Sequence, residues 1–89
     1  MYAILVNEPG GAETSYILPT GAHTLKRALE LMFSRAEEFH SEMLESGAPG
    51  AEDYIIKPHS HSTVDVIDPT REEGEQVVIS FTAYSVEAS

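Results

Sequence analysis

The stretch between Thr24 and Gly47 places the tightest limit on what this chain can fold into. No Gly or Pro interrupts residues 25–46. Apolar side chains recur there at spacings of three and four residues, which places them on one face of an α-helix. They are Leu25, Leu29, Met32, Ala36, Phe39 and Met43, with Ala28, Phe33 and Leu44 widening the stripe. Thr24 can cap the first turn with its hydroxyl, and Gly47 followed by Pro49 predicts the end. The sequence therefore predicts one amphipathic helix.

The segments on either side of this helix have the composition of β-strands. We expect an antiparallel hairpin from Tyr2–Asn7 and Thr14–Leu18, with a turn at 8–13 and an end at Pro19-Thr20-Gly21. Three further strands are predicted after the helix, at Asp53–Lys57, Thr63–Ile67 and Gln76–Glu87. A turn at 58–62 and a loop at 68–75 separate them. The last strand has apolar residues on both faces, which favours a central position in the sheet.

The predicted order is β-β-α-β-β-β, and we assign residues 1–89 to a single α+β domain. The expected architecture is one amphipathic helix packed on a mainly antiparallel four- to five-stranded sheet. One helix cannot cover both sheet faces, so we predict an apolar second face. We expect it to carry Tyr84, Val78 and Val86, with Tyr2 or Tyr16. Such a face favours a homodimer or a partner contact, formed through that face or through an edge strand.

Charge excludes several classes of partner. The chain has 15 acidic and 5 basic residues, a formal net charge of −10. Nucleic-acid binding needs clustered Lys and Arg, so we expect no direct contact with DNA or RNA. The same charge repels anionic membranes and attracts basic protein surfaces. No cysteine is present, which excludes thiol catalysis and zinc-thiolate sites and fits a cytoplasmic protein.

A row of carboxylates is the first candidate binding surface. The outer helix face and the residues just beyond it hold Glu30, Glu37, Glu38, Glu42, Glu45, Glu52 and Asp53. At 1.5 Å per helical residue, the row extends over roughly 25–30 Å. A row of this kind can imitate the phosphates of a nucleic acid and occupy a basic groove on another protein. The plain alternative is an ordinary solvated helix face.

His59 and His61 are the candidate metal ligands. On an extended chain their imidazoles project to the same side, and Asp65 or Asp68 can complete a nitrogen and oxygen site. A solvated turn is the alternative. Neither a framed nucleophile nor a glycine-rich phosphate loop is present, and adjacent carboxylates such as Glu37 and Glu38 point in different directions. We therefore expect a non-enzymatic protein without a cofactor.

Two resemblances bear on function. The segments Tyr2–Val6 and Ser15–Leu18, followed by Thr24-Leu25-x-x-Ala28-Leu29, resemble the opening of HicB-type antitoxins over about the first 45 residues. The Asp-Leu-Pro-Gly stretch of that family is replaced here by Leu18-Pro19-Thr20-Gly21. The small, acidic, cysteine-free profile also resembles phage-encoded inhibitors of host defence, including anti-CRISPR proteins.

These observations predict a non-enzymatic acidic module that binds proteins. An anti-CRISPR-like inhibitor that occupies a basic, nucleic-acid-binding surface of a host protein fits this description. One alternative is a small dimeric protein that binds a ligand or metal, with or without enzymatic activity. Its residues would be His59, His61 and Asp65, and Tyr54 or Tyr84 would form a wall of the binding site. Another is a HicB-like antitoxin component.

Overall fold

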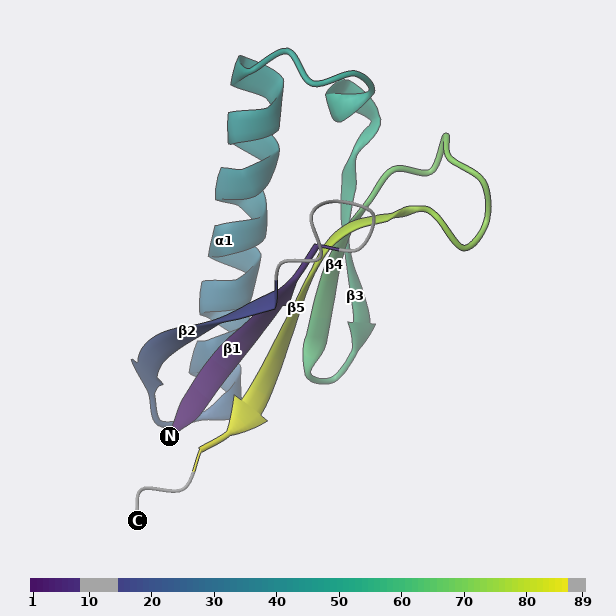
Figure 1. Cartoon of the computed structure of the whole chain (residues 1–89). Coiled ribbons are helices and arrows are strands. Elements are labelled where there is room, and N and C mark those ends of the chain that lie inside the picture. Colours follow the sequence, from purple (N-terminus) through teal and green to yellow (C-terminus); the bar gives the residue numbers. More distant parts are fainter. Residues whose placement is uncertain (9–14, 87–89) are drawn as a thin grey trace.

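The computed structural model describes residues 1–8 and 15–86 and shows one helix packed on one face of a five-stranded sheet (Figure 1). The strands are β1 (Tyr2–Asn7), β2 (Ser15–Ala22), β3 (Ile55–Ser60), β4 (Thr63–Ile67) and β5 (Val77–Ser85). The helix is α1 (Leu25–Glu45), and a short 3-10 helix, η1 (Ala51–Asp53), follows it. The sheet order is β2-β1-β5-β4-β3, with every neighbouring pair antiparallel. The predicted fold class is confirmed.

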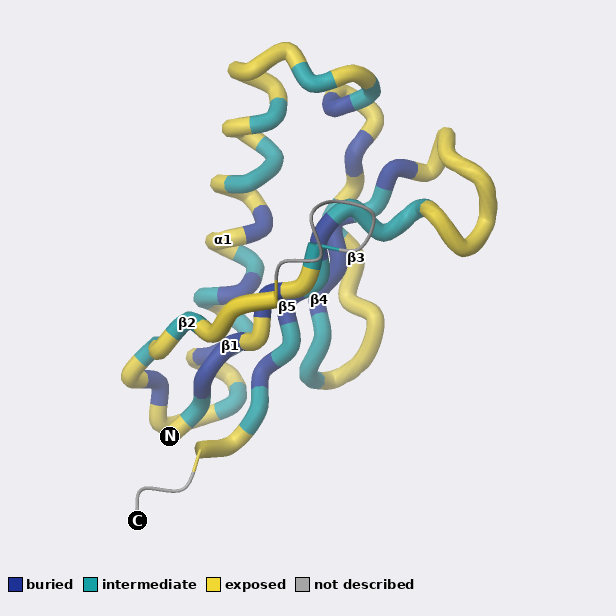
Figure 2. Tube along the Cα trace, viewed as in Figure 1, coloured by how far each residue is buried: buried dark blue, intermediate teal, exposed yellow. Residues whose placement is uncertain are grey.

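The core lies between α1 and the middle of the sheet. In β5, Ile79, Phe81 and Ala83 are buried, whereas the side chains between them are only half-buried (Figure 2). The antiparallel register places Phe81 opposite Val6 on one side and opposite Val64 on the other. These apolar rows pack against Ala28, Met32 and Ala36 of the helix. The predicted alternation of β5 and its central position are both confirmed.

The helix begins and ends as its capping residues predict. The Thr24 hydroxyl accepts a hydrogen bond from the Arg27 amide at 3.1 Å. At the other end Gly47 has φ +71°, and the Ala48 amide donates to the Met43 carbonyl at 3.0 Å, which is the Schellman arrangement. The prediction for Leu44 is wrong, because its side chain is 48 % exposed. Position 44 lies about 100° around the helix from Met43 and turns away from the sheet.

Strand β2 is longer than predicted, because Pro19-Thr20-Gly21 continues it instead of ending it. The Thr20 hydroxyl donates to the Tyr2 carbonyl at 2.7 Å and accepts from the Ala22 amide at 3.0 Å. These bonds carry the pairing past an irregularity between Tyr2 and Ala3. An edge strand tolerates a proline, since one of its sides has no ladder bonds to make.

Strand β3 also differs from its predicted bounds. It starts at Ile55 rather than Asp53, because Ala51–Asp53 form η1. It continues through Pro58, His59 and Ser60, which were expected in a turn, with an irregularity between Pro58 and Ser60. Its edge position again accommodates the proline. Most of the turn expected at 8–13 and the end of the last predicted strand lie outside the described residues.

The loop between β4 and β5 is held at its base by Asp68. The Asp68 amide donates to the Gln76 carbonyl at 2.8 Å, which closes the loop. Its buried carboxylate accepts hydrogen bonds from the Thr70 hydroxyl and amide and lies 3.3 Å from Arg71 Nε. The Thr70 hydroxyl bond, aided by the Arg71 charge, holds the pKa of Asp68 below its ordinary value of 3.8. A Cβ at Gly50 would lie 3.1 Å from this carboxylate, and Gly50 has φ +80°.

We expect the substitution Asp68→Asn to lower stability in a pH-dependent way. Because the folded pKa is depressed, the carboxylate stabilises the fold fully above its ordinary value of 3.8, and this contribution is lost as the pH falls through the folded pKa. Urea unfolding should therefore separate variant from wild type at neutral pH and bring them together in strong acid. Glu72→Gln, a change to an exposed carboxylate of the same loop, is the control. A gap of constant size across this pH range would contradict the assignment.

Candidate protein interface

The predicted helix carboxylates all lie on the solvent side of α1. Glu30, Glu37, Glu38, Glu42 and Glu45 are exposed. At about 100° per residue they fall within an arc of about 140°. The buried residues Ala28, Met32 and Ala36 occupy the opposite side of the helix. Over about 22 Å from Glu30 to Glu45, the helix therefore presents all five carboxylates on one solvent-facing side, which also carries Ser34 and Ser41.

Negative charge is concentrated in the C-terminal half of this surface. Arg27 pairs with Glu30 at 3.0 Å in the N-terminal half, and Arg35, at the middle of the helix, pairs with Glu38 of the C-terminal half at 3.5 Å. All four side chains are more than half exposed, so each pair contributes little to stability. No Lys or Arg occurs between residues 36 and 56. That segment carries Glu37, Glu38, Glu42, Glu45, Glu52 and Asp53.

The last two of these carboxylates are placed by η1. Glu52 and Asp53 are exposed, whereas Ala51 before them is buried. His40 of α1 holds η1 in place, because its Nε2 lies 2.8 Å from the Ala51 carbonyl oxygen. The His40 ring also packs on Tyr54, with ring centroids 5.9 Å apart. Glu52 and Asp53 therefore add two exposed carboxylates beside the C-terminal half of α1, on the side of the helix that carries His40.

Helix stability does not account for this charge arrangement. The first turn of α1 contains no acidic residue and the last turn no basic residue, which is the reverse of what the helix dipole favours. Glu38, Glu42 and Glu45 are separated by four and three positions, so they also repel one another. Each of these effects destabilises the helix by tenths of a kcal/mol. These carboxylates therefore serve either solvation of the helix face or binding of a partner, and not helix stability.

A groove lies beside the acidic half of the helix, between α1 and the sheet. Its volume is about 230 Å³. Six of its ten lining residues are apolar or aromatic, and the other four are charged. The lining residues are Glu8, Tyr16, Leu18, Arg35, Glu38, Phe39, Glu42, Met43, Ile79 and Phe81.

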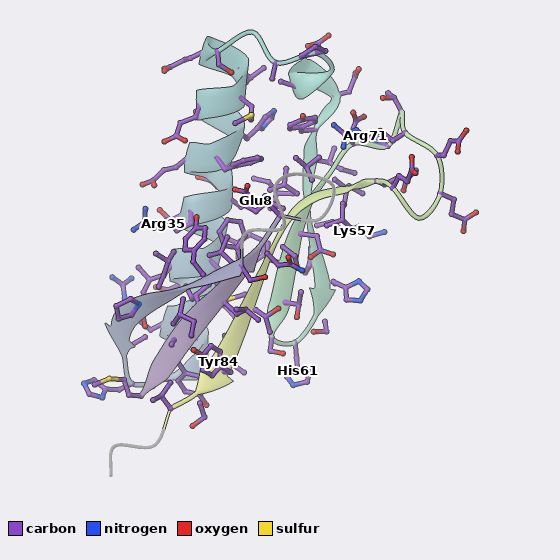
Figure 3. The ribbon with its side chains drawn as sticks, in the orientation of Figure 1. Glu8, Arg35, Lys57, His61, Arg71 and Tyr84 are labelled. Carbon is purple, nitrogen blue, oxygen red and sulfur yellow. The ribbon has the colours of Figure 1, made fainter. Side chains whose placement is uncertain are left out.

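The groove exists because α1 leaves the helix-facing side of β2 partly uncovered. Tyr16, opposite Val6 in the ladder, is 45 % exposed although it lies on the same face as the core. Glu8 reaches the groove because it continues the alternation of Ile4 and Val6 along β1. Glu8 and Arg35 are both labelled in Figure 3. The sequence did not lead to this site: strand alternation and the spacing of Arg35, Glu38 and Glu42 indicate which face each residue lies on, but not that these faces meet.

The opposite sheet face carries a hollow whose lining side chains are all uncharged. Its volume is about 240 Å³, and it is lined by Met1, Tyr2, Ala3, Ile17, Pro19, Thr20, Tyr84 and Val86. Ile17 is 58 % exposed. Tyr84 and Val78 alternate with the buried residues of β5 and so lie on this far face, as predicted. Tyr16 lies on the helix-facing side instead.

Asp65 forms the main polar cluster of the far face. This buried carboxylate accepts a hydrogen bond from the Ser80 hydroxyl at 2.7 Å, and its other oxygen lies 3.7 Å from His59 Nδ1. Lys57 is its partner in the β3–β4 ladder. In a nucleophilic triad the imidazole takes the serine proton. Here the carboxylate stands between hydroxyl and imidazole, so the geometry does not activate Ser80.

The histidines predicted as metal ligands lie at one end of the β3–β4 hairpin. His59 belongs to β3, and His61 lies in the following turn, where Figure 3 labels it. Both are exposed. Across residues 1–8 and 15–86, no group of three or more His, Cys, Asp or Glu side chains is arranged to hold a metal ion. Asp65 lies near His59, whereas Asp68 is engaged by Thr70 and Arg71.

Comparison with known proteins identifies no relative: no family model, no curated protein and no solved structure matches this chain. Within the described part of the chain, α1 and η1 are the helices, and neither has the length and apolarity needed to cross a membrane.

We expect Glu45→Lys to stabilise the folded chain. The change removes a repulsive neighbour of Glu42 and places a positive charge in the last turn, where the helix dipole favours one. At low salt the free energy of unfolding should rise by about 0.3–1 kcal/mol, measured by thermal or urea denaturation. Glu73→Lys changes the net charge equally in the β4–β5 loop and is the control. An equal gain in both variants would point to net charge instead of the helix.

Proposed function

We propose that this chain is a non-enzymatic protein-binding module that occupies a basic, nucleic-acid-binding surface of another protein. Inhibitors of the anti-CRISPR kind act at surfaces of this type. The observation that carries the proposal is the acidic half of α1 together with the neighbouring η1. They carry six exposed carboxylates, of which Glu38 alone forms an ion pair among the described residues, and no Lys or Arg occurs between residues 36 and 56. This charge lowers helix stability, so we assign it to binding.

The physical basis of this function is electrostatic complementarity. A nucleic-acid-binding surface carries closely spaced Lys and Arg that neutralise phosphates. Carboxylates fixed on a rigid helix can meet the same cations, and helical spacing keeps them apart by several ångströms. A net charge of −10 also raises the rate at which the chain meets a basic surface. Binding by this mechanism weakens as salt screens the charges.

A displacement assay tests the proposal directly. Each of a panel of purified basic nucleic-acid-binding proteins is loaded with a fluorescent oligonucleotide, and the chain is titrated in. We expect release of the oligonucleotide from at least one panel member, weaker at high salt. Glu37→Gln/Glu45→Gln should reduce release, whereas the matched pair Glu72→Gln/Glu73→Gln in the β4–β5 loop should leave it unchanged. If the release does not change with salt concentration and is the same for wild type and Glu37→Gln/Glu45→Gln, the electrostatic mechanism is refuted.

A dimeric ligand-binding protein is the second candidate, and the uncharged hollow of the far face favours it. Two copies that each carry −10 repel, so contact between them requires a surface without carboxylates. The hollow meets this requirement, because none of its lining residues is Asp, Glu, Lys or Arg. Two paired copies would enclose a cavity for a ligand, and Ile17 and Tyr84 of each copy would form its apolar walls.

Analytical ultracentrifugation distinguishes this candidate. If the far face pairs two copies, the wild-type chain sediments as a dimer at micromolar concentration, and Ile17→Glu sediments as a monomer because it buries charge at the contact. Glu73→Gln, away from the hollow, should keep the dimer. A wild-type chain that remains monomeric at high concentration would exclude self-association through this face.

A further inference from the structure

We propose that the groove beside α1 is an anchor pocket for one basic side chain, Arg or Lys, of the partner protein. This inference rests on the proposed function and adds the place where the partner is held. The acidic helix face attracts a basic surface without selecting any particular residue. The groove adds shape and an apolar contact at one point of that surface.

The floor of the groove fits the aliphatic stem of a long basic side chain. Leu18 and Met43 are half-buried and keep apolar surface toward the groove, whereas Ile79 and Phe81 beneath them are almost fully buried and only close its base. A volume of about 230 Å³ corresponds to on the order of seven water molecules at about 30 Å³ each, which gives room for a single long side chain. Basic side chains bury their methylene stems on apolar surface while their charged ends stay near water.

The charges of the groove fit the cationic end of the same side chain. Glu8, Glu38 and Glu42 line it, against the single cation of Arg35. Arg35 is paired with Glu38 at 3.5 Å. Among the described residues neither Glu8 nor Glu42 forms an ion pair, so both carboxylates are available to an incoming cation. The lining therefore carries two more negative than positive charges.

Two aromatic rings strengthen the preference for a cation. Tyr16 and Phe39 line the groove, one from β2 and one from α1, and neither ring is fully buried. An Arg or Lys head placed over an aromatic face is attracted by the negative charge of the ring face. An uncharged apolar side chain would gain the floor alone, and an acidic one would be repelled by Glu8 and Glu42. The combination of floor, carboxylates and rings selects a basic side chain.

An NMR titration with blocked tripeptides tests the anchor pocket. The probe is acetyl-Ala-Arg-Ala-amide, and its counterpart carries norleucine, which keeps the stem without the charge. We expect saturable shifts of the backbone amides of Leu18, Phe39, Glu42 and Met43 with the Arg probe. Glu8→Gln/Glu42→Gln should weaken binding on the order of threefold to tenfold. Glu72→Gln/Glu73→Gln, an equal charge change in the β4–β5 loop and outside the groove, should leave the dissociation constant within about twofold.

Each contrary result removes the anchor pocket. Equal binding of the norleucine peptide would mean that the groove has no preference for a cation. An equal loss in both double variants would mean that overall charge, not the groove, holds the probe. If the chemical shifts of the groove amides change with protein concentration in the absence of peptide, the occupant of the groove is a second copy of the chain. Shifts that stay linear, or that appear elsewhere, would also refute the pocket.

The same variants separate this inference from the proposed function. If oligonucleotide displacement occurs and Glu8→Gln/Glu42→Gln displaces as well as wild type, the anchor pocket fails while the proposed function stands. If the Arg peptide saturates the groove but no panel protein releases its oligonucleotide, the proposed function fails while the pocket stands. If Glu8→Gln/Glu42→Gln reduces oligonucleotide displacement more than Glu37→Gln/Glu45→Gln does, the result supports both the anchor pocket and the proposed function.

Discussion

Coverage of the sheet by a single helix is the constraint on which the rest of this structure depends. Five strands spaced about 4.8 Å apart span about 19 Å between the outermost two, whereas a helix with its side chains is about 10–12 Å wide. Ala28, Met32 and Ala36 therefore cover the middle of the sheet, and the helix leaves the β2 edge and the β3 edge uncovered. Other residues must cover those two edges. The small side chains at positions 28 and 36 allow the helix to approach β1, β5 and β4 closely, so the fully buried core lies between the helix and these three strands.

The β3 edge is covered by η1 and the β2 edge is only partly covered, and this difference creates the candidate site. At the β3 margin, η1 adds Ala51 and Tyr54 to the core, and His40 joins them to the helix through the Ala51 carbonyl. At the β2 margin, Tyr16 and Leu18 face the helix side without complete cover. The groove of α1 and β2 is thus a consequence of helix width and of where the short 3-10 helix happens to pack.

The sequence allowed prediction of elements whose signals are local. The 3.6-residue periodicity of α1, the Thr24 cap and the Gly47 terminator are set by neighbouring residues, and so is the alternation of β5. Strand ends were less predictable, because Pro19 and Pro58 are tolerated only in strands that lie at a sheet edge. The carboxylates of α1 were predictable from spacing. The groove was not, since it requires Glu8, Tyr16 and Glu42 to meet through strand order and helix placement, which no local pattern specifies.

Carboxylates and uncovered apolar surface lie together at the C-terminal half of α1, and their proximity has a physical consequence. An apolar groove on a small domain promotes contact between copies of the same chain. Glu8, Glu38 and Glu42 oppose that contact, because a second copy brings the same negative charge to the same place. A basic side chain meets no such barrier and gains both the charges and the apolar floor. In the proposed function, the acidic residues of the groove thus disfavour a second copy of the chain and favour a partner of opposite charge.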